Sequence, residues 1–354
     1  MSPRKPQSQT VVQRPTVKTL AQSTGYSIAT ISKALRDSPV VTAETKERIR
    51  EAALKAGYQA NMRGVSLRAG KTFQAAVLMP VTVAEGFEWD GVEYTQILSG
   101  ISQALEGSAY HIAVHVIRDA EDGRLTAQRI VEAGLADGII FSGIRADDPR
   151  IDFLVERNFP FVALGRCRKP LAYAHVDVDN DWAAHAATRR LIAGGHRRIA
   201  LINPDQRLSY AMDRIDGFRR ALGEHGLAPC DDLIAAGGLT TRFGKESALH
   251  LRRLPDPPTG FIGVNEATTL GVLAGLAELG LTAGREVDVI AYDDINVSAY
   301  FSPPLTTFYL PIERLGRKLG EFFLRRLAGE EPAALQEIYR PDLVVRQANK
   351  LSGT

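Results

Sequence analysis

Cysteine is scarce in this chain of 354 residues, which contains only Cys167 and Cys230. The two lie far apart and neither belongs to a CxxC pair, so we expect no disulfide framework and no structural zinc site. No apolar run approaches the roughly 18 to 20 residues that a membrane-spanning helix needs. The polar and basic N-terminus also lacks the apolar core of a secretory signal. These absences predict a protein of the reducing cytoplasm that does not associate with membranes.

Motifs of catalysis are missing as well. The sequence has no GxSxG elbow, no phosphate-binding P-loop and no dinucleotide-binding glycine pattern after a suitable strand. His111 and His115 stand four apart, but in an alternating, strand-like run, and we do not expect them to hold a metal. Cys167 lies between Arg166 and Arg168, yet no histidine partner can be assigned to it. We therefore expect no enzyme activity, no cofactor and no bound metal.

What the chain does have is an uneven distribution of charge. Of 43 Lys and Arg and 41 Asp and Glu, residues 1–71 hold 13 basic and 4 acidic side chains, a net charge of +9. The remaining residues hold 30 basic and 37 acidic side chains, a net charge of −7. A small basic head on a mildly acidic body favours a polyanionic partner for the head, although a solvated basic tail would have the same composition.

The basic head shows the pattern of three short helices. Thr16, Ser27 and Thr42 each precede a helical stretch and can cap it, while Gly25 supplies a tight turn and Gly57 ends the third helix. The first two helices are predicted over 17–24 and 28–35. Apolar residues at helical spacing predict a small core made of Val17, Leu20, Ala21, Ile31, Leu35, Ile49 and Leu54.

The first two of these helices have the spacing of a helix-turn-helix. Ala21 is small where the helices would touch, Gly25 makes the turn, and Ile31 packs back onto the first helix. The N-terminal half of the second helix would then be the part that meets base edges in the major groove. It presents Ser27, Ile28, Ala29, Thr30, Ser32 and Lys33.

From about residue 73 onward, short apolar runs alternate with amphipathic stretches. Continuous apolar strands between helices are typical of parallel sheets covered on both faces. About ten such strands are too many for one compact sheet, so two α/β lobes are expected. The clearest runs are AAVLM (75–79), HIAVHVI (111–117), DGIIF (137–141), PFVAL (160–164), RRIALI (197–202), TGFIGV (259–264), VDVIAY (287–292), PPLTTF (303–308) and DLVVR (342–346).

These features together resemble one family. The stretch TVKTLAQSTGYSIATISKALRDSPVVTAETKERIREAALKAGYQANMRGVSLRAGKT is similar to the DNA-binding head and hinge of the lactose repressor (LacI/GalR) family. The resemblance extends over about residues 15–347. Its landmarks include Gly57-Tyr58, Asn61, Leu67-Arg68, AGGHRRIALI (193–202), RIDGF (214–218) and VIAYDD (289–294). It implies a transcriptional regulator that binds a pseudo-palindromic, double-stranded DNA operator as a homodimer and responds to a small-molecule effector.

The resemblance also assigns roles on the recognition helix. In this family the positions of Ile28, Ala29 and Lys33 read bases. Ile28 and Ala29 are suited to a thymine methyl group, which leaves Lys33 as the expected guanine reader. Hydroxyl side chains suited to phosphate contacts, which set the register on DNA, are Thr16, Ser27, Thr30, Ser32 and Thr42.

Residues 61–71 resemble the family's hinge helix, which lies in the minor groove and inserts a leucine into the central base step. Leu67 occupies the leucine position, and the wedge kinks the duplex. Side chains that can reach phosphates or groove edges are Asn61, Arg63 and Arg68. Ala60 stands where many relatives have proline and Gly64 where many have alanine, and Gly64 should cost the helix about 1 kcal/mol. We expect this segment to order only on DNA; an ordinary flexible linker is the alternative.

The resemblance implies an all-α helix-turn-helix head joined to an α/β core like that of periplasmic binding proteins, with two doubly wound parallel-sheet lobes. The domain boundaries expected from the sequence are a disordered arm over 1–14, the DNA-binding domain over 15–58, the hinge over 59–72, a core over 73–347 and a tail over 348–354. Within the core, we expect one lobe over about 73–175 and 305–330, and the other over about 176–304 and 331–347.

The effector is expected in the cleft between the lobes, beyond the ends of the strands. Polyols need carboxylate, amide and guanidinium groups, and aromatic faces for their C–H side. The expected contacts are Trp89, Arg166, Tyr210, Arg214, Phe243, Asn265 and Asp293, of which Arg214, Asn265 and Asp293 match effector positions of the family. Asp177, Asp179 and Asn180 are instead assigned to helix capping and the lobe hinge.

The effector itself is expected to be a sugar. The segments GVEYTQILSGISQAL and EGSAYHIAVH resemble those of regulators of α-glucoside and other disaccharide uptake in soil bacteria. A di- or oligosaccharide and a role as repressor of carbohydrate uptake and catabolism genes are therefore favoured, with a purine or other metabolite acting as corepressor as the alternative. A transported-solute receptor would need a signal peptide and no helix-turn-helix, and a sugar-modifying enzyme would need a catalytic constellation.

Overall fold

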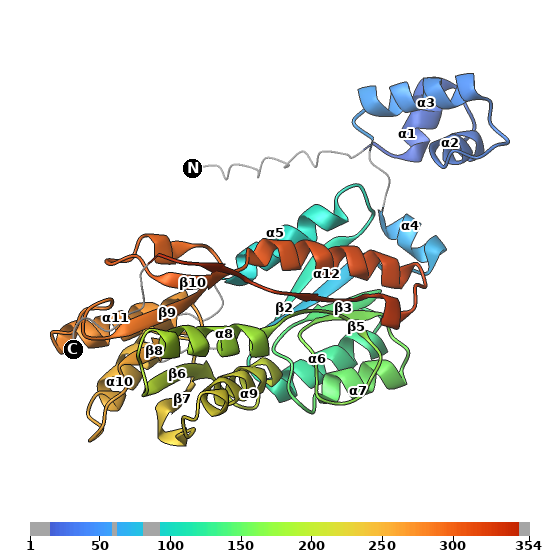
Figure 1. Ribbon diagram of the computed structural model, residues 1–354. Helices are drawn as coiled ribbons and strands as arrows, with labels where there is room; N and C mark the ends of the chain where they lie inside the picture. Colours follow the sequence, from blue (N-terminus) through green and yellow to red (C-terminus); the bar gives the residue numbers. More distant parts are fainter. Residues whose placement is uncertain (1–14, 59–61, 81–92, 347–354) are drawn as a thin grey trace, which may run out of the picture. The chain divides into compact units, whose positions relative to one another are not determined.

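The computed structural model describes residues 15–58, 62–80 and 93–346 of the chain. It consists of two compact units, Met1–Lys71 and Thr72–Thr354, both drawn in Figure 1. No helix in the described part is long and apolar enough to cross a membrane.

The first unit begins with three helices whose ends are set by local hydrogen bonds. They are α1 (Val17–Thr24), α2 (Ile28–Leu35) and α3 (Ala43–Lys55). The hydroxyls of Thr16, Ser27 and Thr42 accept backbone N–H groups three residues on, at 3.3, 3.0 and 3.3 Å, which confirms the three predicted caps. Gly25 ends α1 with a left-handed φ of 74°, a conformation that costs glycine little.

The three helices enclose the small core that the periodicity predicts, with one exception. Its buried members are Leu20, Ile31, Ala34, Val41, Ile49 and Ala53, with Val17, Ala21, Tyr26, Leu35 and Tyr58 packed against them. Leu54 was expected in this core and is 82% exposed. Ile49 and Ala53 are one turn apart and define the buried face of α3, so the residue after Ala53 points away from it.

The segment after the head is helical. Helix α4 spans Met62–Ala69, whereas we expected this segment to be unstructured without DNA. Its eight residues form a short helix, and isolated helices of this length are marginal in water. A side chain added at Gly64 would meet no atom within 4 Å, so packing does not require a glycine at this position. Asn61 and the side chain of Arg63 lie outside the described residues.

The second unit contains two six-stranded sheets, which define two lobes. In the first sheet the strand order is β11-β5-β4-β3-β1-β2, and in the second it is β12-β10-β9-β8-β6-β7. All neighbouring strands are parallel except β10 and β12, which are antiparallel. The strands are β1 (Gln74–Pro80), β2 (His111–Ile117), β3 (Gly138–Phe141), β4 (Phe161–Leu164), β5 (Ala174–Val178), β6 (Ile199–Pro204), β7 (Ile234–Gly237), β8 (Gly260–Ile262), β9 (Asp288–Asp293), β10 (Thr306–Tyr309), β11 (Gln336–Tyr339) and β12 (Asp342–Val344).

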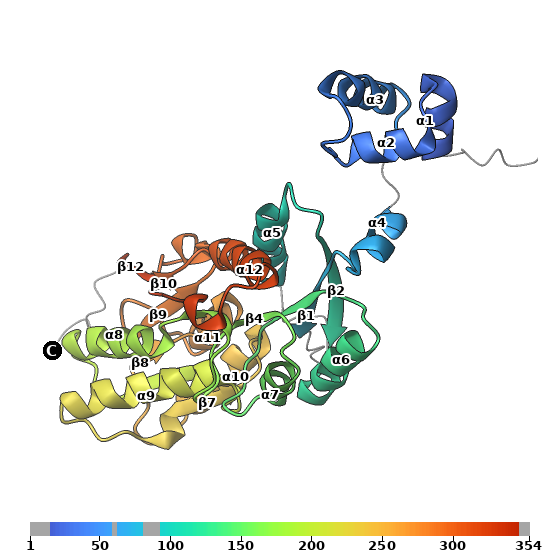
Figure 2. The same cartoon turned by 90° about the vertical axis from the view of Figure 1, so that its right-hand side faces the viewer.

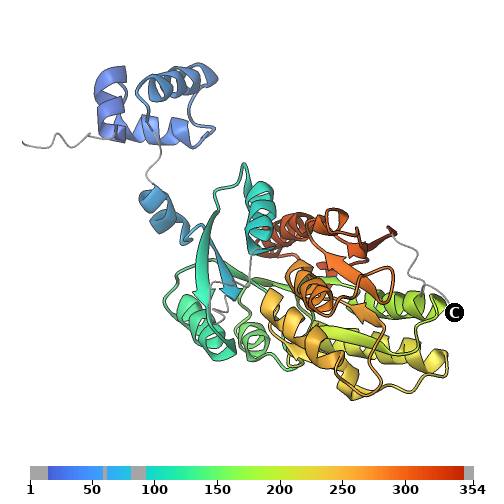
Figure 3. The same cartoon turned by 90° about the vertical axis from the view of Figure 1, so that its left-hand side faces the viewer.

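Helices cover both faces of each sheet, as the continuous apolar runs predict. They are α5 (Glu93–Leu105), α6 (Ala120–Glu132), α7 (Pro149–Glu156), α8 (Asn180–Ala193), α9 (Ser209–Glu224), α10 (Thr241–Leu251), α11 (Glu266–Glu278) and α12 (Ile312–Leu327). In the first lobe α5 and α12 share one apolar core with the sheet, and α6 and α7 share another (Figure 2). In the second lobe α8 and α9 cover one face, and α10 and α11, the yellow to orange segments of Figure 3, cover the other.

The path between the lobes differs from the expected one. Strand β10 was placed in the first lobe and pairs with β9 in the second sheet. Strand β11 was placed in the second lobe and pairs with β5 in the first, with Gln336 opposite His175. The chain therefore crosses three times, after β5, after β10 and after β11. Which sheet a short strand joins depends on contacts with elements far away in the chain, which the local sequence does not encode.

One carboxylate anchors the start of the first sheet. Asp137 accepts hydrogen bonds from the backbone N–H of Thr72 (2.7 Å), the hydroxyl of Thr72 (2.9 Å) and the N–H of Phe73 (2.9 Å). Phe73 has a left-handed φ of 55°, and its ring packs edge-on against Tyr110. The first residues of the second unit are therefore held firmly to the lobe that follows them.

Candidate nucleic-acid interface and ligand cleft

Most of the side chains of helix α2 that we expect to contact DNA are exposed to solvent. Ser27, Ile28, Ala29 and Lys33 are exposed, and Ile28 is 50% exposed although it is a large apolar residue. Ile31 and Ala34 on the opposite face are fully buried in the head. Thr30 and Ser32, expected at phosphates, are half-buried. Exposed apolar side chains beside a lysine are the groups that contact thymine methyls and guanine edges.

The hydroxyls assigned to phosphate already have a structural role. Each of Thr16, Ser27 and Thr42 accepts an N–H group at the start of its helix, and the Ser27 hydroxyl also lies 2.8 Å from that of Thr30. A hydroxyl has one proton to donate and two lone pairs, so a cap can also reach a phosphate oxygen. The N-terminus of a helix favours negative charge, and each of the three hydroxyls lies at the N-terminus of its own helix.

On helix α4 the wedge candidate is fully available. Leu67 is 85% exposed and Arg68 beside it is exposed too. An apolar side chain this exposed stays in water at a cost of about 25 cal/mol per Å² unless something covers it. Among the described residues nothing covers Leu67, and insertion between base pairs requires such an exposed side chain.

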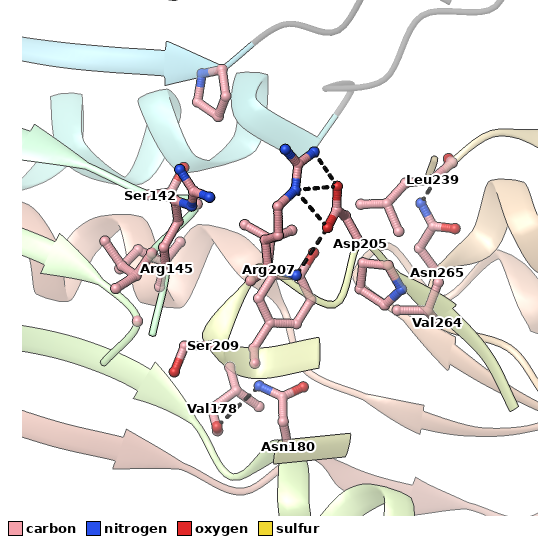
Figure 4. A pocket seen from close by; sticks show the side chains of 18 of the residues that line it. Ser142, Arg145, Val178, Asn180, Asp205, Arg207, Ser209, Leu239, Val264 and Asn265 are labelled. Atoms are coloured by element: carbon pink, nitrogen blue, oxygen red, sulfur yellow. Dashed lines mark hydrogen bonds and ion pairs between the residues drawn. The ribbon is translucent and has the colours of Figure 1, made fainter. Parts of the chain in front are cut away.

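A cleft of about 640 Å³ lies between the lobes, at the carboxyl ends of the strands of both sheets. This volume is typical of sites for small organic molecules. Side chains from successive strand ends converge there, among them Ser142, Asn180 and Asn265 (Figure 4). The polar lining also includes Arg118, Asp119, Arg145, Arg166, Asp177, Asp205, Arg207, Ser209, Tyr210, Arg214 and Asp294.

Arg214 lies deepest among these charged groups, 3% exposed on helix α9. Its Nε donates to the Asn180 Oδ1 at 3.0 Å, and its guanidinium carbon lies 4.4 Å from the centre of the Tyr292 ring. Burial lowers the pKa of Arg214. A buried guanidinium held by an amide and a ring, without a carboxylate bound to it among the described residues, favours a hydrogen-bond acceptor on the ligand.

Arg166 is brought into the cleft beside a partner that the sequence did not suggest. Its Nε lies 2.5 Å from the Asp177 Oδ2, and both residues line the cleft. Burial raises the pKa of Asp177, and the hydrogen bond from Arg166 opposes that rise. Asp177 and Asn180 were assigned to capping and hinge roles, and both belong to the cleft. The segment HVDVDN (175–180) contains most of β5, so Asp177 lies within that strand and Asn180 lies just beyond its carboxyl end, where the cleft is.

Two more of the expected effector contacts lie at the cleft, although their contact with a ligand stays a prediction. Tyr210 and Asn265 line the cleft. The Asn265 side chain also caps α11, accepting from Thr268 N–H at 2.9 Å, and donates to the Leu239 carbonyl at 3.3 Å. Tyr94, at the start of α5, lines the cleft with its hydroxyl 2.8 Å from that of Ser142.

Asp293 and Phe243 do not line the cleft. Asp293 is fully buried, and its carboxylate accepts the N–H groups of Val297 and Ser298 at 3.1 and 2.9 Å. Successive strand residues face opposite sides of a sheet, and the neighbours of Asp293 are the ones that reach the cleft. The ring of Phe243 packs on the second lobe's core against Gly237. Trp89 lies outside the described residues.

Comparison with known proteins agrees with this geometry. Residues 188–348 match the model of a periplasmic binding protein-like domain. The chain is 33% identical to the HTH-type transcriptional regulator AglR of Rhizobium meliloti (strain 1021), over 93% of each chain. It is 32% identical to the HTH-type transcriptional regulator RafR of Escherichia coli, over 92% of this chain and 96% of that one.

A solved structure of the transcriptional regulator CelR in complex with cellobiose is similar along nearly the whole length. It is 26% identical, has a TM-score of 0.70, and the match covers 95% of this chain and 100% of that one. Head, core and order of domains thus agree with regulators and not with enzymes. The resemblance inferred from the sequence is confirmed: this chain belongs to the LacI family of helix-turn-helix transcriptional regulators.

Proposed function

We propose that this regulator represses genes of carbohydrate uptake and catabolism, and that a di- or oligosaccharide in the inter-lobe cleft controls its operator binding. The observation that supports this most is the cleft itself. It has about 640 Å³, and carboxylate, amide, hydroxyl and guanidinium groups of both lobes converge on it. Polyhydroxyl ligands need many hydrogen-bond partners of this kind, on both sides.

The relative solved with cellobiose supports a disaccharide. Cellobiose is named for that protein alone, and the transfer to this chain is our proposal. The residues that we propose as effector contacts are Arg166, Asp177, Asn180, Tyr210, Arg214 and Asn265. Asp177 and Asn180 line the cleft, whereas Asp293 and Phe243, which the sequence suggested, do not.

On DNA, we propose that Lys33 reads a guanine while Ile28 and Ala29 contact thymine methyls. The hydroxyls of Thr16, Ser27 and Thr42 would hold phosphates, and Leu67 would open the central base step. Such a regulator works where the chromosome is, in the cytoplasm. With few base hydrogen bonds on α2, much of the specificity would come from DNA deformation.

The proposed homodimer needs a self-complementary surface, and we propose the β2 edge of the first sheet as that surface. Among the described residues strand β2 pairs with β1 alone, and Val114 and Val116 project from the same face of it, 46% and 61% exposed. An open edge strand offers unpaired backbone groups to a partner, and two exposed valines on one face of it add apolar surface that a partner can bury. We propose that a second copy of this chain covers them.

Effector and operator would be coupled through closure of the lobes. A ligand that binds one arrangement of the lobes better changes the placement of the two heads of a dimer. The coupling free energy of such systems is about 1–3 kcal/mol, and induction and corepression differ only in its sign.

A thermal-shift screen of mono-, di- and oligosaccharides against nucleobases tests the proposal. A ligand at 100 times its Kd stabilises the folded state by about 2.7 kcal/mol, enough for a clear rise in Tm. The hit is then titrated into the protein bound to an operator selected from random duplexes, with fluorescence anisotropy as readout. Stabilisation by a purine and by no sugar would support the corepressor alternative and contradict the sugar proposal.

A further inference from the structure

The two lobes also touch outside the cleft lining, through one arginine and two aspartates. Arg168 lies on the loop after β4, in the first lobe, and Asp213 and Asp216 lie on α9, in the second. One terminal nitrogen of Arg168 lies 2.9 Å from the Asp213 Oδ1 and 2.6 Å from the Asp216 Oδ2. None of the three residues is among those that line the cleft.

A main-chain contact crosses the lobes in the same region of the fold. The N–H of Ser209, at the start of α9, donates to the carbonyl of Ile144 in the first lobe at 2.8 Å. Arg145 and Leu208 beside them form an isolated antiparallel bridge. Opening the lobes would break these contacts and expose the Ser209 amide to water.

The loop that holds Arg168 is braced within its own lobe. The N–H of Arg168 donates to the Ala146 carbonyl at 2.9 Å. Lys169 next to it forms an ion pair of 2.6 Å with Asp152 and a second with Asp147. The main chain at Arg168 is therefore held within the first lobe before the lobes meet, which reduces the entropy lost when the ion pairs form.

The charges of Asp213 and Asp216 favour closure of the two lobes only while Arg168 is there to bind them. Asp213 and Asp216 are one turn apart on α9, so their carboxylates repel one another. With the lobes as they lie in this structure, the Asp213 side chain is 24% exposed, and burial raises its pKa while Arg168 and Arg166 oppose the rise. Without Arg168, closing the lobes would bury a carboxylate beside a like charge, and the open arrangement would leave both in water.

We propose that Arg168, Asp213 and Asp216 form an electrostatic latch that holds the lobes closed and sets the closure equilibrium on which the effector acts. Arg168 is a positioning residue in this scheme, because it acts on the ligand only through closure. A weaker latch lowers the population of the closed state and with it the apparent affinity for a ligand that binds that state.

Amide hydrogen exchange on the full-length protein, without ligand or DNA, tests the latch. The readout is the peptide that contains Ser209, whose amide is protected by the other lobe. Arg168→Gln should speed its exchange about two- to fivefold, and Arg168→Lys should restore most of the protection because an ammonium can also bind two carboxylates. Raising the salt concentration should speed exchange in the natural protein and not in Arg168→Gln.

The matched control is Arg219→Gln on the same helix. Arg219 pairs with Asp231 at 2.6 Å, is similarly exposed, and has its partner in its own lobe. It should leave the exchange of the Ser209 peptide unchanged. In a double-mutant cycle, Arg168→Gln should have no further effect once Asp213→Asn and Asp216→Asn are present.

Equal exchange in the natural protein, Arg168→Gln and Arg219→Gln would overturn the latch, as would an undiminished effect of Arg168→Gln in the neutralised background. Faster exchange throughout the protein would show loss of stability instead of lobe opening, and that result also counts against the latch. The assay uses neither sugar nor DNA, so its outcome is independent of whether the proposed effector is correct.

Discussion

The guanidinium of Arg214 lies on the ring of Tyr292, 4.4 Å from its centre, while Asn180 binds its Nε. The three residues come from α9, β9 and α8, and all line the cleft. A cation over an aromatic face is held in place without a neutralising carboxylate. It keeps its charge for a ligand, which makes Arg214 the strongest single candidate for an effector contact.

Arg214→Ala should weaken binding of the sugar found in the thermal-shift screen by about 10- to 100-fold, the usual effect of losing a charge-assisted hydrogen bond. Calorimetry on the purified protein measures it. Arg219→Ala, on the exposed face of the same helix, is the control and should bind normally. An unchanged affinity in Arg214→Ala would remove this residue from the effector site.

Lys33→Ala should relax the choice of base at one position of each half-site. A specific base contact is worth about 1–3 kcal/mol of discrimination, whereas a phosphate contact weakens all sequences alike. Binding to a panel of single-base operator variants measures the difference, with Lys18→Ala as a control that removes the same charge from α1. Equal losses on operator and random DNA would show that Lys33 contacts phosphate.

Leu67→Ala should reduce bending of the operator and lower its affinity about tenfold or more, because the unstacking of the central step costs a few kcal/mol and needs the wedge. Energy transfer between dyes at the ends of an operator duplex measures the bend. Ser66→Ala on the same helix is the control. Sugar binding should be unaffected in both variants, and a natural bend in Leu67→Ala would contradict the wedge.

Val116→Asp should convert the dimer to a monomer, because it places a carboxylate in the proposed contact between β2 edges. Sedimentation at micromolar concentration measures the oligomeric state. Ile338→Asp is the matched control, since Ile338 is 47% exposed on β11, the opposite edge of the same sheet. If Ile338→Asp dissociates the dimer and Val116→Asp does not, the interface lies elsewhere.

Asp137→Ala should lower the free energy of unfolding of the second unit by about 1–3 kcal/mol, because the three donors of Thr72 and Phe73 lose their acceptor. Urea denaturation followed by circular dichroism measures it. Asp232→Ala, at an exposed position of the second lobe, should change stability by less than about 0.5 kcal/mol. Comparable effects of the two substitutions would mean that the anchor adds little to stability.

The bounds of α1 and α2 and the positions of most core strands could be predicted because their causes are local. A threonine caps a helix that begins one residue later, and an apolar run between helices forms a buried strand wherever it lies in the chain. Strands β5, β7 and β11 were not predicted, because the cause of their extended form is not local. The sequences AHVDV and QEIY lack a continuous apolar run, and IAAG consists mainly of alanine and glycine, which are infrequent in strands; neighbouring strands induce the extended form of all three.

By itself the sequence determined the family, the helix-turn-helix, the two-lobed architecture and the position of the ligand site at the strand ends. Only the tertiary structure decided which side chains meet there. Arg214 and Asn180 are 34 residues apart, and Arg168 and Asp213 are 45 apart and lie in different lobes. Asp293 and Asp294 are adjacent, yet one is buried and the other lines the cleft. Spacing along the chain specifies neighbours within one helix or strand, whereas contacts between elements depend on how the sheets pair and the lobes close.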